Sequence, residues 1–275
     1  MVNPADRPIR KDEVVLEDRG IYIESWLPER RSRRRPLVLV HGELGGSWLW
    51  EQYLGYFAHR GWEGHAINLR AHYWSDTTDV SGIDFESYVF DVLASFDHIP
   101  QNPVLIGHGM GGLVAMRAAE ERHVAGLVLI SSALPAELRT PPRLHVLRDI
   151  PDTFGRELVG WQSLPEQLRR TNPDLTIEDV LRVQHLMGKE SGAARRTMLT
   201  GVQVVRERLE GTPTFVIGGG LDRWFPEPDS ERLAAWLGAQ YEPFGAHSHY
   251  GLVLGSEGYE QVAEAIRHFL ESHRL

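Results

Sequence analysis

The segment at residues 106–112 carries the clearest chemical signal in the sequence. It is a glycine-rich stretch between a short apolar run and an alanine-rich one. A strand, a Gly-x-Ser-x-Gly turn and a helix in this order expose a nucleophilic serine on a sharp turn. Here Gly107 and Gly111 occupy the glycine positions, and Gly109 occupies the position of the serine. Glycine has no side chain that could act as a nucleophile, so a covalent acyl intermediate on residue 109 is excluded.

A glycine-rich turn between a strand and a helix can instead bind a phosphate group. The dinucleotide-binding pattern Gly-x-Gly-x-x-Gly follows the first strand of its domain. The glycines of residues 107–112 do not have this pattern in its usual place after the first predicted strand. The sequence therefore disfavours a phosphate site at this turn.

The composition excludes several classes of site and partner. The chain has 275 residues, no cysteine and a net charge of −9 at pH 7. Without cysteine there is no disulfide, no thiolate metal site and no cysteine nucleophile. The negative charge argues against binding to nucleic acid or to an anionic membrane. The basic run at residues 30–35 is interpreted as a solvated loop between two strands, with an anion-binding patch as the alternative.

No segment predicts export or membrane insertion. Residues 1–7 lack the apolar core of a signal peptide. No apolar run approaches the roughly 20 residues that cross a bilayer, so we expect a cytoplasmic protein that does not bind membranes. No cluster of His, Asp and Glu has metal-ligand spacing, so we expect neither a metal nor another cofactor. The oligomeric state has no signature in the sequence.

Short apolar runs alternate with amphipathic stretches along most of the chain. Strands are predicted at residues 13–18, 21–26, 36–40, 63–68, 104–106, 124–131 and 213–217, and helices at residues 50–60, 84–98, 111–120 and 259–270. This alternation predicts an α/β protein with a mostly parallel central sheet flanked by helices. The first two strands are close enough to form an antiparallel hairpin at one edge.

Residues 133–209, here named the cap segment, interrupt this alternation. Helix-like pieces occur at residues 153–159, 165–170, 177–187 and 193–208, with little strand signal. Because the strand pattern resumes directly afterwards, we expect an inserted helical cap at residues 133–209. Residues 1–132 and 210–275 would then form the core domain. A second helical layer with no role in binding is the alternative.

Four further segments carry histidine, aspartate or glycine near the ends of predicted strands. They are residues 38–50 (with His41-Gly42), 68–76, 216–226 and 245–251. Together with residues 106–112, and in this order, they resemble the α/β-hydrolase superfamily over nearly the whole chain. The segment at 68–76 departs from the family's Arg-Gly-His-Gly-x-Ser-Asp pattern, because Ala71 and Tyr73 replace two glycines.

The resemblance implies roles for an acid and a histidine, in the family's chain order of nucleophile, acid and histidine. Asp222 matches the acid, and Gly109 stands at the place of the nucleophile. His247 and His249 both fall in the segment that carries the family's histidine. We expect His249 to be the base because it lies nearer the final helix, with His247 as the second candidate.

The same resemblance implies an oxyanion hole made by backbone N–H groups. By position these donors are Glu43 and Met110. Gly42 and His108 are expected beside the substrate, His108 as a packed neighbour of the turn. Trp48 and Trp161 are candidates for the pocket wall, although a place in the core suits them equally.

A histidine–aspartate pair that faces an oxyanion hole without a serine is suited to proton abstraction next to a carbonyl group. We therefore expect a cofactor-free lyase or cyclase of natural-product biosynthesis. Its substrate would be a small, largely apolar carbonyl compound or ester.

Three alternatives stay open. The histidine could activate a water molecule and make the protein a serine-free hydrolase. The pocket could bind a ligand without turnover. The glycine could also stand where a natural serine esterase had its nucleophile.

Overall fold

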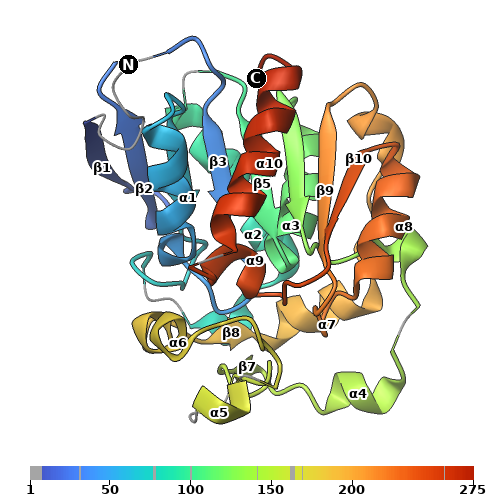
Figure 1. Cartoon of the computed structure of the whole chain (residues 1–275). Helices are drawn as coiled ribbons and strands as arrows, with labels where there is room; N and C mark the ends of the chain where they lie inside the picture. The colour runs from blue at the N-terminus through green and yellow to red at the C-terminus, as the bar shows by residue number, and fades with distance from the viewer. Residues whose placement is uncertain are drawn as a thin grey trace.

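An eight-stranded sheet forms the centre of the molecule (Figure 1). The computed structural model describes residues 8–30, 32–76, 79–99, 101–140, 142–161, 165–168, 170–256 and 258–275. In spatial order the strands are β1 (Ile9–Leu16), β2 (Ile21–Pro28), β4 (Gly64–Ile67), β3 (Leu37–Val40), β5 (Val104–His108), β6 (Gly126–Ile130), β9 (Thr214–Gly219) and β10 (Gln240–Phe244). In this spatial order, each strand from β4 onward pairs in parallel with the next one. Strand β2 pairs antiparallel with both of its neighbours, β1 and β4. The prediction of a mostly parallel sheet with an antiparallel edge is confirmed.

The central strands are the apolar runs of the sequence. Every residue of β3, β5, β6 and β9 is buried. A parallel sheet that is covered on both faces needs such continuous apolar strands. This is why the sequence predicted these four strands close to their true positions.

Helices cover both faces of the sheet, as predicted. On one face α1 (Glu51–Ala58) contacts α10 (Tyr259–Ser272), and on the other α2 (Phe85–Ser95) contacts α3 (Met110–Glu121). Helix α8 (Glu227–Leu237) packs its buried residues into the same hydrophobic cluster as α2 and α3. Figure 1 shows α1 and α10 in front of the sheet. None of the described helices is both long and apolar enough to cross a membrane.

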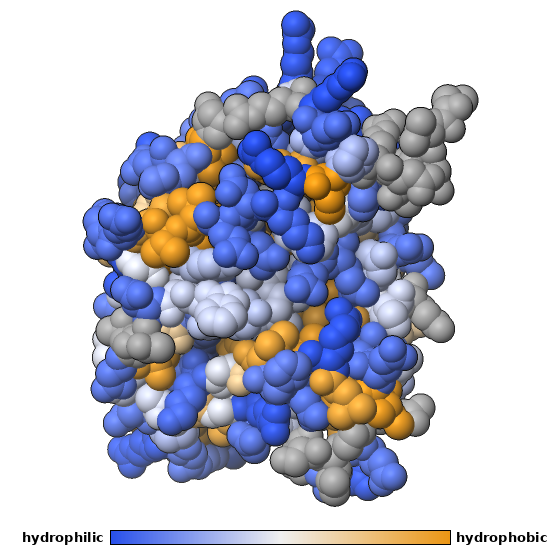
Figure 2. Space-filling model, turned by 90° about the vertical axis from the view of Figure 1, so that its left-hand side faces the viewer, coloured by the Kyte–Doolittle hydropathy of each residue, from blue (hydrophilic) through white to orange (hydrophobic). Residues whose placement is uncertain are grey.

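The two edge strands differ from the central ones. Strand β1 is exposed along most of its length, and it begins earlier than the predicted 13–18. Its charged residues discourage pairing with another chain. Figure 2 looks onto the side of β1, where hydrophilic residues surround smaller apolar patches. Strand β10 was missed by the sequence analysis because its residues are only partly buried and include Pro243.

The cap segment lies next to the carboxyl ends of the parallel strands, at the bottom of Figure 1. Its described elements are η5 (Ala136–Leu138), α4 (Leu144–Arg148), β7 (Thr153–Phe154), α5 (Pro165–Leu168), α6 (Ile177–Val183), β8 (Glu190–Ser191), α7 (Gly192–Thr200) and η6 (Arg206–Leu209). The predicted helix at residues 153–159 is wrong, because Thr153 and Phe154 pair antiparallel with β8. Two residues are too few to show a strand pattern in the sequence.

The loop after β4 has a backbone shape that usually requires glycine. Ala71 has a φ of 61° and Tyr73 a φ of 49°. A side chain in this left-handed region costs roughly 1 kcal/mol. The loop is held at its ends, since Asn68 accepts a hydrogen bond from the N–H of Ser47 at 2.7 Å and its carbonyl accepts one from the Ser75 hydroxyl at 2.6 Å. The loop therefore keeps this shape although two glycines of the resembled pattern are replaced.

Candidate active site

The turn between β5 and α3 has the tight geometry predicted for residues 106–112. Gly109 connects the two elements with a φ of 57° and a ψ of −122°, a conformation that side chains rarely adopt. Cβ atoms built on Gly107 and Gly111 would lie 2.4 Å from the carbonyl of Gly111 and 2.3 Å from the carbonyl of His41. The two flanking glycines are therefore required by the close approach of strand and helix.

Asp222 and His249 form a hydrogen-bonded pair beside this turn. Asp222 follows β9, and His249 precedes α9 (Gly251–Leu254). Nδ1 of His249 donates to Oδ2 of Asp222 at 2.7 Å, and both side chains are buried. The other carboxylate oxygen accepts the N–H groups of Trp224 and Phe225 at 2.7 and 3.0 Å. The aspartate is thus fixed, and it keeps the proton of the neutral imidazole on Nδ1.

The free nitrogen of His249 faces the position where a serine side chain would start. A Cβ atom built on Gly109 would lie 3.2 Å from both Nε2 and Cε1 of His249, and 3.7 Å from Phe225. This separation from Nε2 is within the reach of a hydrogen bond. A water molecule or a substrate atom at this point would therefore be within reach of Nε2.

The second candidate histidine lies elsewhere. The ring of His247 packs edge-on against Phe244 at 5.6 Å and approaches Gly258. The carbonyl of His247 accepts the N–H of Leu221. Of the two histidines, the structure brings only His249 into contact with Asp222 and Gly109.

The two expected oxyanion donors border the same space. Met110 is the first residue of α3, where a helix offers no backbone acceptor for its N–H. Glu43 follows β3 in a turn that is closed by a hydrogen bond from Gly45 to Gly42 at 3.2 Å. Both residues line the cavity in front of His249. The two residues expected to form the oxyanion hole therefore border one cavity together with His249.

A buried carboxylate from the cap segment supports the turn of Glu43. Oε2 of Glu190 accepts the N–H of Leu44 at 3.2 Å and contacts Nε2 of His72 at 3.0 Å. Tyr88 donates to Oε1 at 2.5 Å. Burial opposes ionisation of Glu190, but His72 and the hydrogen bonds outweigh it and lower the pKa of Glu190. Burial likewise opposes a charge on His72, but Glu190 outweighs it and raises the pKa of His72.

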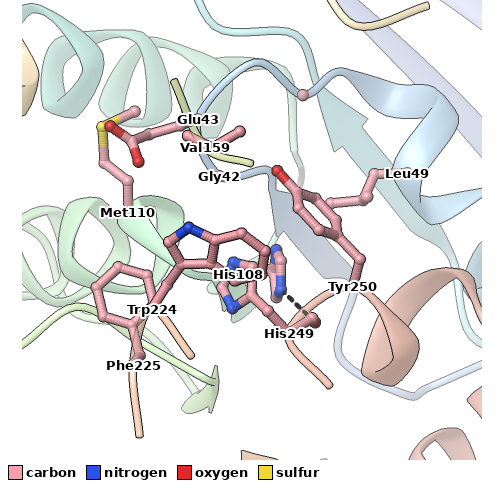
Figure 3. Close-up of a pocket in the computed structure, with 11 residues that line it drawn as sticks. Gly42, Glu43, Leu49, His108, Met110, Val159, Trp224, Phe225, His249 and Tyr250 are labelled. Atoms are coloured by element: carbon pink, nitrogen blue, oxygen red, sulfur yellow. Dashed lines mark hydrogen bonds between the residues drawn. The ribbon is translucent and has the colours of Figure 1, made fainter. Parts of the chain in front are cut away.

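His108 packs directly behind His249. Its Nε2 donates to the carbonyl of His249 at 3.0 Å, and the two ring centroids are 4.1 Å apart (Figure 3). Burial, with a further contribution from His249, lowers the pKa of His108 well below its usual range. A neutral imidazole that donates a hydrogen bond to the backbone of His249 positions that residue. His108 was expected to be a packed neighbour of the turn, and it does pack against His249.

The cavity in front of His249 is small. Its volume is about 20 Å³, which accommodates about one water molecule. It is lined by Gly42, Glu43, Gly45, Leu49, His108, Met110, Val159, Trp224, Phe225, His249 and Tyr250 (Figure 3). Among the described residues, no three potential metal-ligand side chains of His, Cys, Asp or Glu come together.

Gly42 and His108 are in this lining as expected, but Trp48 and Trp161 are not. Trp48 is buried in the hydrophobic cluster on the α1 face, and Trp161 packs edge-on against Tyr250 at 4.9 Å. The sequence analysis missed Trp224 and Phe225 as wall residues, although their position two and three residues after Asp222 was a usable signal.

The side chain of Glu43 also borders the cavity, which no motif predicted. Oε2 accepts a hydrogen bond from Nη1 of Arg195 in α7 at 2.6 Å, while Oε1 is buried and has no partner among the described residues. Burial raises the pKa of Glu43, and Arg195 only partly offsets this. The contact joins the turn after β3 to helix α7 of the cap segment.

Comparisons with known proteins identify the family and the fold of the chain. A model of the alpha/beta hydrolase family matches residues 37–265. A pyrethroid hydrolase of Sphingobium wenxiniae is 28% identical over 107 residues. This match spans 38% of the present chain and 38% of the length of that curated relative.

Solved structures share the fold over almost the whole chain. MenH from S. aureus is 18% identical, with a TM-score of 0.70 over 92% of this chain and 99% of its own. A monoacylglycerol lipase of Paleococcus ferrophilus is 21% identical, with a TM-score of 0.68 over 92% of this chain and 99% of its own. At these identities the likeness shows a common fold. It does not show a common substrate.

Proposed function

The chain belongs to the alpha/beta hydrolase family, and we propose that its His249–Asp222 pair acts as a general base on a carbonyl substrate without a protein nucleophile. The observation that carries this proposal is the position of Nε2 of His249. This atom faces the place of the missing side chain of residue 109, at 3.2 Å from the Cβ position. Asp222 holds the imidazole by a hydrogen bond of 2.7 Å.

The proposed reaction is elimination or cyclisation. Nε2 of His249 takes a proton from the carbon next to the carbonyl group, and the electrons of that C–H bond form an enolate. The N–H groups of Glu43 and Met110 stabilise the enolate oxygen, each by about 3 kcal/mol. The enolate then expels a β-acyloxy group as a carboxylate, or it attacks a second carbonyl in the same molecule and closes a ring. Protonated His249 returns its proton to the carboxylate or to the new alkoxide.

The walls of the cavity support a largely apolar substrate. Leu49, Val159, Trp224 and Phe225 supply apolar surface around the histidine. A volume of about 20 Å³ is far below the several hundred Å³ of a typical ligand pocket. Val159 and Arg195 belong to the cap segment, so a displacement of this segment is the proposed way for a substrate to enter.

Hydrolysis by an activated water molecule is the second candidate function. The observation in its favour is the same volume, which suits one water molecule beside Nε2 of His249. Such a water would attack the carbonyl carbon of an ester while His249 takes its proton. The N–H groups of Glu43 and Met110 would then stabilise the tetrahedral oxyanion.

The test is a substrate screen that is read by mass. Wild type, His249→Ala and the control variant His247→Ala are incubated with aryl ketones that carry β-acyloxy groups, with diketones and with simple esters. Loss of a carboxylic acid, or an unchanged mass with a new retention time, in wild type and His247→Ala alone is the expected result. A gain of water that needs His249 would favour the second candidate. Products that form equally well with His249→Ala would overturn both.

A further inference from the structure

Glu43, a residue of the cavity wall, has a buried carboxylate oxygen without a partner among the described residues. Oε1 of Glu43 makes no hydrogen bond with the described residues, while Oε2 is held by Arg195 at 2.6 Å. Only 11% of the Glu43 side chain is exposed. A buried acceptor without a donor is unfavourable, so a donor group of a bound ligand is expected to satisfy it. We propose that Glu43 binds a hydroxyl group of the substrate.

The charge balance favours a hydroxyl group over a cationic donor. Arg195 already neutralises the carboxylate, and 15% of its side chain is exposed. An ammonium group beside this pair would leave an unpaired positive charge in a small cavity, which is costly. A hydroxyl group donates one hydrogen bond and adds no charge.

The connection of the carboxylate to the oxyanion hole determines where this hydroxyl group lies in the substrate. This step rests on the proposed function, in which the N–H of Glu43 binds the carbonyl oxygen. The carboxylate is the side chain of the same residue and borders the same cavity as His249. The hydroxyl group therefore lies within a few bonds of the carbonyl group, and the substrate class is a hydroxylated carbonyl compound with an apolar remainder.

Tyr250 also lines the cavity, and its side chain carries a hydroxyl group. Figure 3 shows its ring among the residues around His249. Burial, and next the nearby charge of Glu43, raise the pKa of Tyr250, so its hydroxyl keeps its proton. A neutral phenol can donate to the substrate hydroxyl while that hydroxyl donates to Glu43.

The experiment compares two ligands that differ by one hydroxyl group. Benzylacetone and its β-hydroxy derivative are titrated calorimetrically into wild type, Glu43→Gln and the control Glu51→Gln, which changes an exposed glutamate. Wild type is expected to bind the hydroxy ketone at least about tenfold tighter, since hydrogen bonds to charged groups are the stronger ones. Glu43→Gln places an amide donor at the acceptor position and should lose this preference. Glu51→Gln should keep it.

Equal affinities in wild type, or no binding of either ketone, would overturn the inference, as would a preference that survives in Glu43→Gln. The wild-type comparison needs no variant, so it decides the matter even if Glu43→Gln does not fold. If the hydroxy ketone is converted during titration, the same comparison is made in the His249→Ala background. A hydroxyl preference without turnover separates a failure of the proposed chemistry from a failure of this inference.

Discussion

At the scale of single residues, the site depends on what surrounds His249. Its Nδ1 is hydrogen-bonded to Asp222, and its backbone carbonyl accepts a hydrogen bond from His108. Its Nε2 faces a position without a side chain. The imidazole is therefore held on one side and available on the other, as a general base must be.

Placing a serine at position 109 should introduce nucleophilic catalysis. In Gly109→Ser the new Cβ lies 3.2 Å from Nε2, so a small shift of His249 brings the hydroxyl group within reach. We expect this variant to hydrolyse p-nitrophenyl acetate and to accumulate an acetylated form that is visible by mass spectrometry. The left-handed φ of residue 109 should lower its unfolding free energy by about 1–3 kcal/mol. Gly109→Ala has the same strain and no hydroxyl, so equal activity in both variants would contradict the expectation.

Asp222→Asn should impair turnover and leave binding intact. An amide at this position no longer holds the imidazole in the tautomer with its proton on Nδ1, and it does not stabilise the imidazolium ion. We expect kcat to fall by about 10⁴ on the substrate that the mass screen identifies, with little change in KM. Asp229→Asn, on α8 in an ion pair with Arg232, is the control. A fall of less than tenfold would mean that His249 is not a base in the reaction.

Sequence reasoning reached some of these residues and missed others. It preferred His249 to His247 from the distance to the final helix, and the hydrogen bond to Asp222 agrees with that choice. It could not find the side-chain role of Glu43, because the partner Arg195 is 152 positions away in the sequence. Contacts of this length depend on how the cap segment folds, and short motifs carry no information about that.

At the scale of elements, β8 is joined to the core by the buried pair of Glu190 and His72. Replacing Glu190 by Gln should lower the unfolding free energy by about 3 kcal/mol near pH 5.5, because it leaves a buried partner without its counter-charge. Because the pKa of Glu190 is lowered in the folded protein, its carboxylate stabilises the fold fully at pH values above its ordinary pKa of 4.5. This stabilisation is lost as pH falls through the lowered pKa. Because the pKa of His72 is raised in the folded protein, its imidazolium stabilises the fold fully at pH values below its ordinary pKa of 6.5. This stabilisation is lost as pH rises through the raised pKa.

The stability difference between wild type and Glu190→Gln should therefore be largest between pH 4.5 and 6.5. Denaturant unfolding of both proteins across this range and on each side of it measures the difference. A difference that is independent of pH would show that the pair is not ionised in the folded protein.

The loop after β4 should become more stable when glycine returns to it. Ala71→Gly removes a Cβ from a residue with a φ of 61° and should raise the unfolding free energy by about 0.5–1 kcal/mol. Ala265→Gly, within α10, is the matched substitution in a helix and should lower it by about 1 kcal/mol. Thermal unfolding of both variants measures the contrast. A change of the same sign in the two would refute the assignment of strain to Ala71.

The central strands of the sheet were easier to predict than the elements of the cap segment and the edge strand β10. Strands such as β5 and β6 are buried on both faces, so their apolar runs are visible in the sequence. Strand β10 lies at an edge and mixes polar and apolar residues, so it has no such run. Strand β7 has two residues and depends on pairing with β8, which the sequence of β7 alone does not encode.

At the scale of the whole molecule, the core and the cap segment are held together at the site itself. Arg195 of α7 binds Glu43 of the core, and the neighbouring Arg196 binds Ile150 and Asp152 within the cap segment. Arg195→Met should therefore increase hydrogen exchange both in α7 and in the turn at residues 42–46. Arg196→Met should increase exchange near residues 150–152 alone. Equal exchange in the turn for the two variants would show that the Glu43–Arg195 contact does not hold the cap segment over the site.

The unusual backbone angles of this chain also have an evolutionary consequence. Gly109 holds a left-handed φ without a side chain, whereas Ala71 and Tyr73 hold theirs with one. A lineage tolerates such destabilising side chains only while the total stability stays above the threshold for folding. Serine at position 109 would add a further strained residue to the five described non-glycine residues that already have a positive φ. We therefore expect a serine at position 109 to be tolerated less well in this chain than in a variant with glycine at positions 71 and 73.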